Sequence, residues 1–159
     1  SILTSFRSNL IINSLNKDSL SDDIKNQLHK LDESHFPCPW SIESWQNCYE
    51  NFDNYSLFVF ESEKEVVGFS LFQLSPLENL AHLLKIVITP NSRRTGVATD
   101  TLRNNIVSLS EKKFDKIFLE VEVTNIAAIA LYKKCGLKVI HTKNNFYGSG
   151  RHAFIMMSA

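Results

Sequence analysis

Two successive strand–turn–helix patterns, between residues 83 and 137, constrain the fold of this chain more than any other feature. The first reads LLKIVITPNSRRTGVATDTL (residues 83–102), and the second reads FLEVEVTNIAAIALYKKCGL (residues 118–137). Each passes from an apolar run through a polar turn into a segment whose apolar residues have helical spacing. This succession indicates a βαβα segment.

The remaining apolar segments are mostly short, and they alternate with turn residues. A helix is expected after Ser19-Leu-Ser-Asp22, which resembles a capping box, and it must stop before Pro37. A second helix is expected over residues 41–49, and the βαβα segment supplies two more, the last of which Thr124 or Asn125 caps and Gly136 ends. Strands are expected at residues 10–15, 55–61, 66–74, 82–89, 117–123, 137–142 and 153–157. The pattern predicts an α+β (mixed α/β) fold with a sheet of about seven strands and three to four helices.

Length and composition are those of an ordinary globular protein. The 159 residues predict one domain over residues 1–159, of which residues 1–9 are expected to form a frayed extension. The 17 basic and 17 acidic residues balance, so neither nucleic acid nor an anionic membrane is an expected partner. No apolar run has the length of a membrane span. The three cysteines, Cys38, Cys48 and Cys135, show no metal spacing, so we expect reduced thiols, a cytoplasmic protein and no metal.

The polar turn of the first pattern combines small residues with positive charge. Arg93 and Arg94 precede Gly96, and the following helix begins near Ala98. The N–H groups at a helix start favour anions, and arginines add fork-shaped donors, so this turn is a candidate phosphate site. An ordinary solvated turn is the simpler interpretation. The turn matches neither a Walker loop, which needs Gly-Lys-Ser/Thr, nor a dinucleotide fingerprint, which needs three glycines.

Taken on pattern alone, the other candidates have simple structural interpretations. Glu120 reads as a solvent-facing strand carboxylate, although its apolar neighbours could make it a better base. Tyr132 reads as a tyrosine at the edge of the core. The aromatic residues of two loops, HFPCPW (residues 35–40) and Phe146-Tyr147, read as loop packing. The five histidines have no partner at ligand spacing and receive no role.

The residues of both patterns nevertheless resemble a known family. Arg93-x-x-Gly96-x-Ala98 after a strand looks like the acetyl-CoA pyrophosphate loop of the GNAT acyltransferases. LEVEVTNIAAIALYKKCGL is similar to the corresponding block of the RimI-type enzymes, which acetylate the N-terminal alanine of a small-subunit ribosomal protein. The resemblance is close from about residue 82 to 137 and looser outward to residues 36 and 157. Ala98 for glycine, Leu137 for phenylalanine and Phe146 for tyrosine are departures from the family pattern.

This resemblance implies a mostly antiparallel sheet whose fourth and fifth strands are parallel and splay apart around acetyl-CoA. Glu120 would be the general base and Tyr132 the general acid. The backbone N–H of Ile88 would face the thioester oxygen. The implied acetyl-CoA site comprises Ile86, Val87, Ile88, Arg93, Arg94, Thr95, Gly96, Val97, Ala98, Thr99 and Asn125. The implied acceptor site comprises Phe36, Trp40, Glu122, Phe146 and Tyr147.

The resulting prediction is an acetyl-CoA-dependent Nα-acetyltransferase, with the N-terminal alanine of a ribosomal protein as acceptor. Two alternatives stay open at this point. One is a GNAT transferase for a lysine side chain or a small amine, and the other is an acyl-CoA-binding module without turnover. We expect a monomer or a weak dimer whose partner is a protein or peptide N-terminus.

Overall fold

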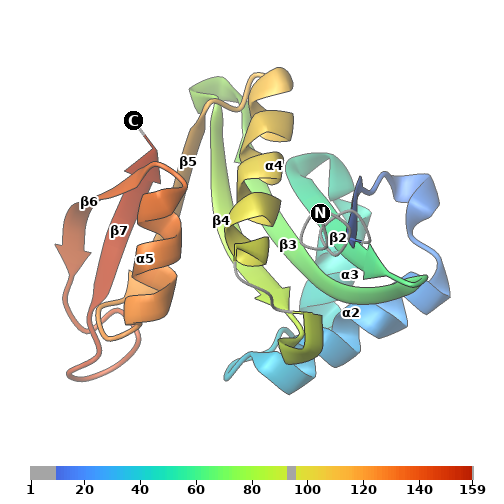
Figure 1. Cartoon of the computed structure of the whole chain (residues 1–159), viewed down its shortest axis with the longest axis horizontal. Coiled ribbons are helices and arrows are strands. Elements are labelled where there is room, and N and C mark those ends of the chain that lie inside the picture. The colour runs from blue at the N-terminus through green and yellow to red at the C-terminus, as the bar shows by residue number, and fades with distance from the viewer. Residues whose placement is uncertain (1–9, 93–95, 159) are drawn as a thin grey trace. The chain divides into compact units, whose positions relative to one another are not determined.

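The computed structural model describes residues 10–92 and 96–158 (Figure 1). Seven strands form one sheet in the order β1-β2-β3-β4-β5-β7-β6. The pairs β1–β2, β2–β3, β5–β7 and β6–β7 are antiparallel, whereas β4 and β5 are parallel. Four α-helices lie within the described ranges. The mostly antiparallel seven-stranded fold expected from the sequence, with parallel fourth and fifth strands, is therefore confirmed.

The chain divides into two compact units. The first comprises Ser1–Gln73 and Leu84–Arg94, and the second comprises Leu74–Leu83 and Thr95–Ala159. β4 (Leu80–Ile88) contributes to both, because the division falls between Leu83 and Leu84. The single domain expected over residues 1–159 stays a prediction.

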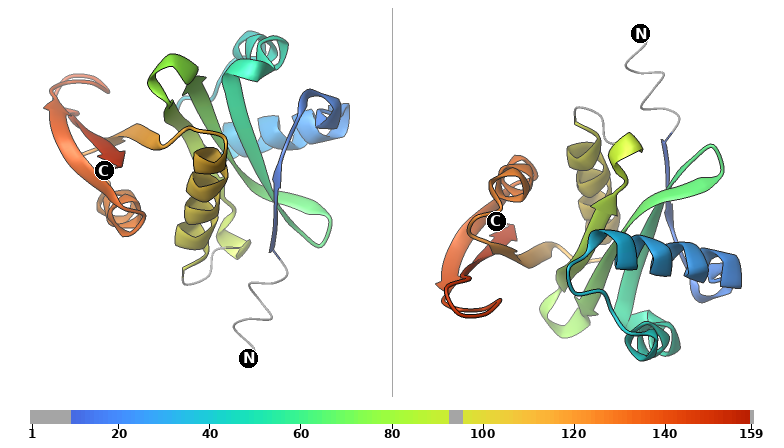
Figure 2. Two further views of the ribbon diagram at one scale, coloured as in Figure 1. Left: turned by 90° about the horizontal axis from the view of Figure 1, so that it is seen from above. Right: turned by 90° about the horizontal axis from the view of Figure 1, so that it is seen from below.

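The first unit packs two helices against antiparallel strands. Its strands β1 (Leu10–Ser14), β2 (Tyr55–Ser62) and β3 (Glu65–Ser75) carry α2 (Asp22–His35) and α3 (Ile42–Glu50) together on one face (Figure 2). Trp45 is buried in the middle of this packing, with its ring centroid 5.8 Å from that of Phe69. The buried core of the unit comprises Leu28, Leu31, Trp45, Cys48, Tyr49, Phe52, Leu57, Val59, Phe69, Leu71 and Val87.

The N-cap of helix α2 lies two residues after Ser19, where the expected capping box starts. Ser19 ends a short 3₁₀ turn (Lys17–Ser19), and the N-cap is Ser21, whose Oγ accepts a hydrogen bond from the N–H of Ile24 at 3.2 Å. The prediction of Ser19 as the cap was therefore wrong. Asp22 is the first residue of the helix, so it does not occupy the N3 position that a capping box with Ser19 requires. The helix ends at His35, before the first proline, as expected.

The second unit contains the rest of the βαβα segment and the two closing strands. Its strands are β5 (Lys116–Glu122), β6 (Leu137–Lys143) and β7 (Ala153–Ser158), joined by the start of β4. Its helices are α4 (Val97–Glu111) and α5 (Ile126–Lys134), and α5 lies beside β6 and β7 (Figure 1).

Short 3₁₀ turns elsewhere in the described chain span Phe52–Asn54, Pro76–Glu78 and Pro90–Ser92.

Strand β5 alternates strictly between its two faces. Ile117, Leu119 and Val121 are buried, whereas Phe118, Glu120 and Glu122 are half-buried on the opposite face. The alternation follows from the twofold side-chain period of a strand. It places both carboxylates of β5 on one face, as the sequence predicted.

None of the helices in residues 10–92 and 96–158 combines the length and apolar character that crossing a bilayer requires. The cysteines Cys38, Cys48 and Cys135 are all free thiols.

Candidate active site

Glu120 is held by a histidine that the sequence pattern did not point to. The Nε2 atom of His82 lies 2.6 Å from Oε1 and 2.9 Å from Oε2 of Glu120. The side chains of His82 and Glu120 are 24% and 15% exposed, so the pair is sheltered but open to solvent. The parallel register of β4 and β5, which sets His82 opposite Phe118, brings the two residues together. Glu120 is therefore neither fully solvated nor unpartnered.

The ring of Phe118 fixes the orientation of His82. The two ring centroids are 4.0 Å apart and the rings are nearly parallel, with an interplanar angle of 17°. An ionised carboxylate has no proton to donate, so a hydrogen bond to ionised Glu120 requires the proton on Nε2 of His82. The stacking of Phe118 on His82 and the hydrogen bond from Nε2 of His82 together fix the position of the Glu120 carboxylate.

Glu122, the second carboxylate of this face, is neutralised by an arginine. The guanidinium of Arg151 donates to both carboxylate oxygens, with Nε–Oε2 at 2.9 Å and Nη2–Oε1 at 2.7 Å. These hydrogen bonds, and then the charge of Arg151, hold the pKa of Glu122 below its ordinary value. Fork-shaped pairing of this kind is geometrically specific. Glu122 is therefore a different kind of group from Glu120.

Tyr147 lies close to both carboxylates. Burial, followed by the charges of Glu120 and Glu122, raises the pKa of its hydroxyl. Its backbone N–H donates to the carbonyl of Arg151 at 3.1 Å, and its ring packs edge-on against Phe146 at 4.9 Å. The structure thus brings together Glu120, Glu122 and Tyr147, three of the residues singled out in the sequence, within the second unit.

Tyr132 lies on α5 and is 8% exposed. Burial, and then the neighbouring Tyr147 and Cys135, raise the pKa of its hydroxyl to about 12. A phenol with this pKa keeps its proton throughout the neutral range. Tyr132 therefore has the protonation state that a proton donor needs.

The start of α4 differs from the starts of the other three helices. Side chains of Ser21, Ser41 and Asn125 cap α2, α3 and α5, whereas the N-cap of α4 is Gly96, which makes no side-chain cap. Gly96 has φ +83°, a left-handed conformation that glycine adopts without strain. Gly96 therefore places no side chain over the N–H groups of the first turn of α4, which contains Val97, Ala98 and Thr99, and such N–H groups are what an anion site requires. Arg93, Arg94 and Thr95 lie outside the described residues.

Asn125 has a structural task that the sequence also predicted. Its Oδ1 accepts the N–H of Ala128 at 3.2 Å and so caps α5. The left-handed Gly136 ends the same helix. A contact of Asn125 with acetyl-CoA can use its amide NH₂ group, which takes no part in the cap.

Five of the predicted site residues that the structure describes lie in the first unit. Val87 and Ile88 on β4 are buried and Ile86 is half-buried. Phe36 and Trp40 are half-buried at the two ends of the proline-containing segment, and they pack on Phe69 and Trp45 respectively. These aromatic residues are therefore packed into the unit rather than loosely placed on its surface.

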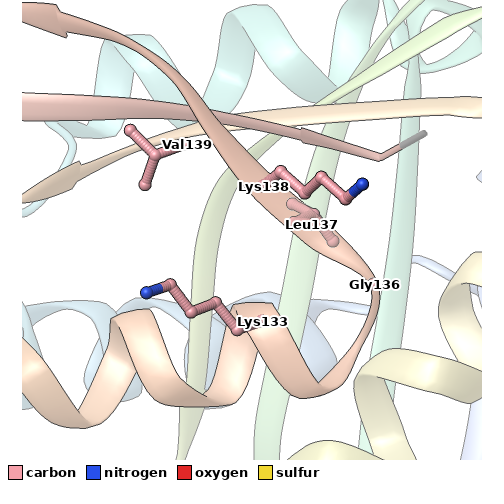
Figure 3. A pocket seen from close by; sticks show the side chains of 5 residues that line it. All are labelled: Lys133, Gly136, Leu137, Lys138 and Val139. Carbon is pink, nitrogen blue, oxygen red and sulfur yellow. The ribbon is translucent and has the colours of Figure 1, made fainter.

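One hollow of the second unit is lined by none of the predicted site residues. It has a volume of about 420 Å³ and lies between the end of α5 and the start of β6 (Figure 3). Its lining residues are Lys133, Gly136, Leu137, Lys138 and Val139. They supply no carboxylate, imidazole, hydroxyl or thiol. Within the described residues, no cluster of histidine, cysteine and acidic side chains is suited to hold a metal ion.

Comparison with known proteins gives consistent results. Residues 25–137 match the acetyltransferase (GNAT) family. An N-alpha-acetyltransferase of Sulfurisphaera tokodaii is 32% identical over 112 residues, which cover 64% of this chain and 67% of that protein. The [ribosomal protein bS18]-alanine N-acetyltransferase of Escherichia coli is 28% identical over 122 residues, covering 76% of this chain and 80% of that protein.

Solved structures show the same fold. The ribosomal-protein-S18-alanine N-acetyltransferase of Escherichia coli superposes with a TM-score of 0.78 at 24% identity, covering 94% of this chain and 92% of that one. A spermidine N-acetyltransferase from Vibrio cholerae, in complex with CoA and spermine, superposes with a TM-score of 0.77 at 19% identity, covering 94% and 95%. An enzyme named for a protein acceptor and one named for a polyamine acceptor superpose on this chain about equally well, so the fold alone does not identify the acceptor.

Proposed function

The chain belongs to the acetyltransferase (GNAT) family, and we propose that it acetylates the N-terminal amine of a protein. It is an acetyltransferase that uses acetyl-CoA as its acetyl donor. The observation that carries the proposal is the sheltered pair of Glu120 and His82 on one face of β4 and β5.

Acetyl transfer to an amine requires that the amine lose a proton as its nitrogen bonds to the acetyl carbon. In the proposed mechanism Glu120 takes this proton, directly or through a water. His82 keeps the carboxylate oriented, and Phe118 keeps the imidazole in place. The nearby Glu122 does not compete for the role, because its charge is committed to Arg151.

The leaving thiolate needs a proton when the carbon–sulfur bond breaks. Tyr132 is proposed to supply it, because its hydroxyl, whose pKa burial raises to about 12, carries a proton at neutral pH. The main-chain N–H of Ile88 is assigned to the thioester oxygen, where a donor would stabilise the developing negative charge.

Replacing Tyr132 with Phe tests this donor. A thiol of pKa ~8.5 leaves with less help than an amine would, so we expect turnover to fall by ~10–10²-fold, toward the low end of acid catalysis. The acetyl-CoA affinity should stay within about twofold, because the ring and its packing remain. Single-turnover kinetics and calorimetry would measure the two quantities. An equally active Phe variant would reduce Tyr132 to a packing residue.

The acetyl-CoA site is proposed from the start of α4 and the end of β4. The uncapped first turn of α4 suits the pyrophosphate, with Arg93 and Arg94 adding charge. Ile86, Val87 and Ile88 are proposed to offer main-chain hydrogen bonds to the pantetheine amides, as an added strand would. The amide NH₂ of Asn125 is proposed to donate to one of the pantetheine carbonyls.

The acceptor follows from the chemistry of amines. A protein N-terminus has a pKa of ~7.7–8.0 against ~10.4 for lysine, so at neutral pH far more of it is already nucleophilic. A single carboxylate base such as Glu120 therefore suits an α-amine. The names of the Sulfurisphaera and Escherichia relatives agree with this choice. We propose a small first residue, with the N-terminal alanine of a ribosomal protein as the leading candidate and the cytoplasm as the place of action.

The two β5 carboxylates together suggest a preference for basic residues after the first acceptor position. The structure weakens this argument, because Arg151 matches the charge of Glu122 through two hydrogen bonds. The proposal therefore includes no requirement for a basic second residue.

Release of free thiol from acetyl-CoA separates turnover from mere binding. We expect rapid release with a peptide that begins with alanine and almost none with the same peptide blocked at its N-terminus. Release that needs no acceptor peptide, or that the blocked peptide supports equally well, would contradict the proposed acceptor. No release with any amine, despite bound acetyl-CoA, would favour a binding module.

A further inference from the structure

A buried ion pair crosses the core of the first unit. The Nζ atom of Lys85, on β4, lies 2.6 Å from Oδ1 of Asp32, on α2, and the two side chains are 5% and 1% exposed. Lysine and aspartate are rarely buried so completely. A buried pair of this kind stabilises a fold little more than apolar residues of the same size would. A contribution to stability therefore does not by itself explain why this ion pair is buried here.

Asp32 holds both ends of the Phe36–Trp40 segment. Its backbone carbonyl accepts the N–H of Phe36 at 3.1 Å, and its Oδ2 atom accepts the N–H of Trp40 at 2.9 Å. Pro37 and Pro39 have no N–H groups, so these two hydrogen bonds use two of the three N–H groups that the segment possesses. Oδ2 also accepts the indole N–H of Trp45, on α3, at 2.9 Å.

Lys85 contacts the same two residues through their rings. Its Nζ atom lies 4.6 Å from the ring centroid of Phe36 and 5.3 Å from that of Trp40. An ammonium at these distances from an aromatic face is attracted to it, more strongly where water is excluded. The ion pair therefore contacts both the first and the last residue of the segment. Asp32 accepts hydrogen bonds from the backbone N–H groups of Phe36 and Trp40, and Lys85 contacts the rings of the same two residues.

We propose that Lys85 is a positioning residue for the acceptor. Lys85 pairs with Asp32 and lies over both rings, and so keeps the Phe36–Trp40 segment in one conformation. This inference rests on the proposed function and on the acceptor site that the family resemblance implies, which includes Phe36 and Trp40. We call the ion pair of Asp32 and Lys85, with its contacts to Phe36 and Trp40, the clamp. Lys85 is followed directly by Ile86–Ile88, the proposed pantetheine strand, so β4 carries both a residue of the clamp and the proposed acetyl-CoA contacts.

The test begins with Lys85→Met, which keeps the length of the side chain and removes its charge. We expect kcat/KM for an N-terminal peptide to fall by about 10–100-fold, mostly through KM, because a displaced segment misplaces the acceptor. Acetyl-CoA affinity should change by less than about twofold, since no proposed acetyl-CoA contact is lost. Lys30→Met, which removes an exposed lysine of the same helix as Asp32, is the matched control and should leave all values unchanged.

A second variant separates positioning from folding. Lys85→Met leaves Asp32 as an unpaired buried charge, and adding Asp32→Asn removes that charge. The double variant should regain thermal stability but keep the raised KM. Recovery of KM together with stability would overturn the proposal and leave the pair a purely structural role.

Tryptophan fluorescence gives a readout that does not depend on activity. The chain has two tryptophans, and both Trp40 and Trp45 donate hydrogen bonds to Asp32. Quenching by acrylamide should increase in Lys85→Met and stay unchanged in Lys30→Met. Increased quenching with an unchanged KM would show that the clamp opens without affecting the acceptor, and would overturn the positioning role. If wild-type enzyme acetylates no peptide, the proposed function fails and the acceptor role fails with it, while quenching still reports on the clamp.

Discussion

Replacing Glu120 with Gln is expected to slow acetyl transfer by ~10²–10⁴-fold, the usual range for a lost general base. The amide has nearly the shape of the carboxylate but cannot take the proton of the amine. His82 and Phe118 remain to hold the side chain, so acetyl-CoA affinity and thermal stability should change little. Part of the lost rate should return at higher pH, because an N-terminal amine with pKa ~7.7–8.0 deprotonates unaided there. Steady-state rates from pH 6 to 10 would measure the effect.

Glu122→Gln is the matched control, because it lies on the same face of the same strand. Its carboxylate is paired with Arg151 rather than held by a histidine, so its loss should leave turnover within a few-fold of wild type. If Glu122→Gln proves the more damaging change, the assignment of the base to Glu120 is wrong. A ratio of wild-type to Glu120→Gln turnover rates that does not change with pH would likewise show that the carboxylate does not remove the proton.

Replacing Gly68 with Ala is expected to cost ~3 kcal/mol of folding free energy, at the upper end of overpacking effects. A Cβ at this position of β3 would clash with the carbonyl oxygen of Val87 and would lie 3.0 Å from Cα of Ile88. Both are backbone atoms of β4, which cannot move aside as the end of a flexible side chain could. Chemical denaturation would measure the loss. Because β4 also carries the proposed pantetheine contacts, acetyl-CoA affinity should fall in the folded fraction.

Gly150→Ala provides the comparison. A Cβ there has no neighbour within 4 Å, and only the left-handed φ of +75° opposes it. Its expected cost is the ~1 kcal/mol of a non-glycine residue in that conformation. Equal losses at the two positions would show that the close approach of β3 and β4 does not limit the size of residue 68.

Much of the fold could be predicted because its signals are local. The twofold alternation of β5 placed Glu120 and Glu122 on one face, and the N-cap and left-handed glycine bounded α5. The prolines that end α2 act on their immediate neighbours in the same way. The cap of α2 was misplaced because several serines and aspartates there offer competing caps, and tertiary packing decides between them.

The parts of the site that were missed depend on contacts between distant residues. His82 lies 38 residues before Glu120, and only the parallel register of β4 and β5 brings them together. Lys85 lies 53 residues after Asp32, and a lysine inside an apolar strand gives no sign of its partner. An unexpected charge or imidazole in a buried strand is itself the signal that could have found both.

The identity of one reaction product shows whether the acceptor is an α-amine. A peptide that begins with alanine and contains an internal lysine offers both amines in the same molecule. After incubation with the enzyme and acetyl-CoA, fragmentation mass spectrometry shows which nitrogen carries the acetyl group. The proposed function predicts acetylation of the N-terminal alanine with the lysine largely unmodified. Acetyl groups found mainly on the lysine, or only on small amines such as polyamines, would contradict it.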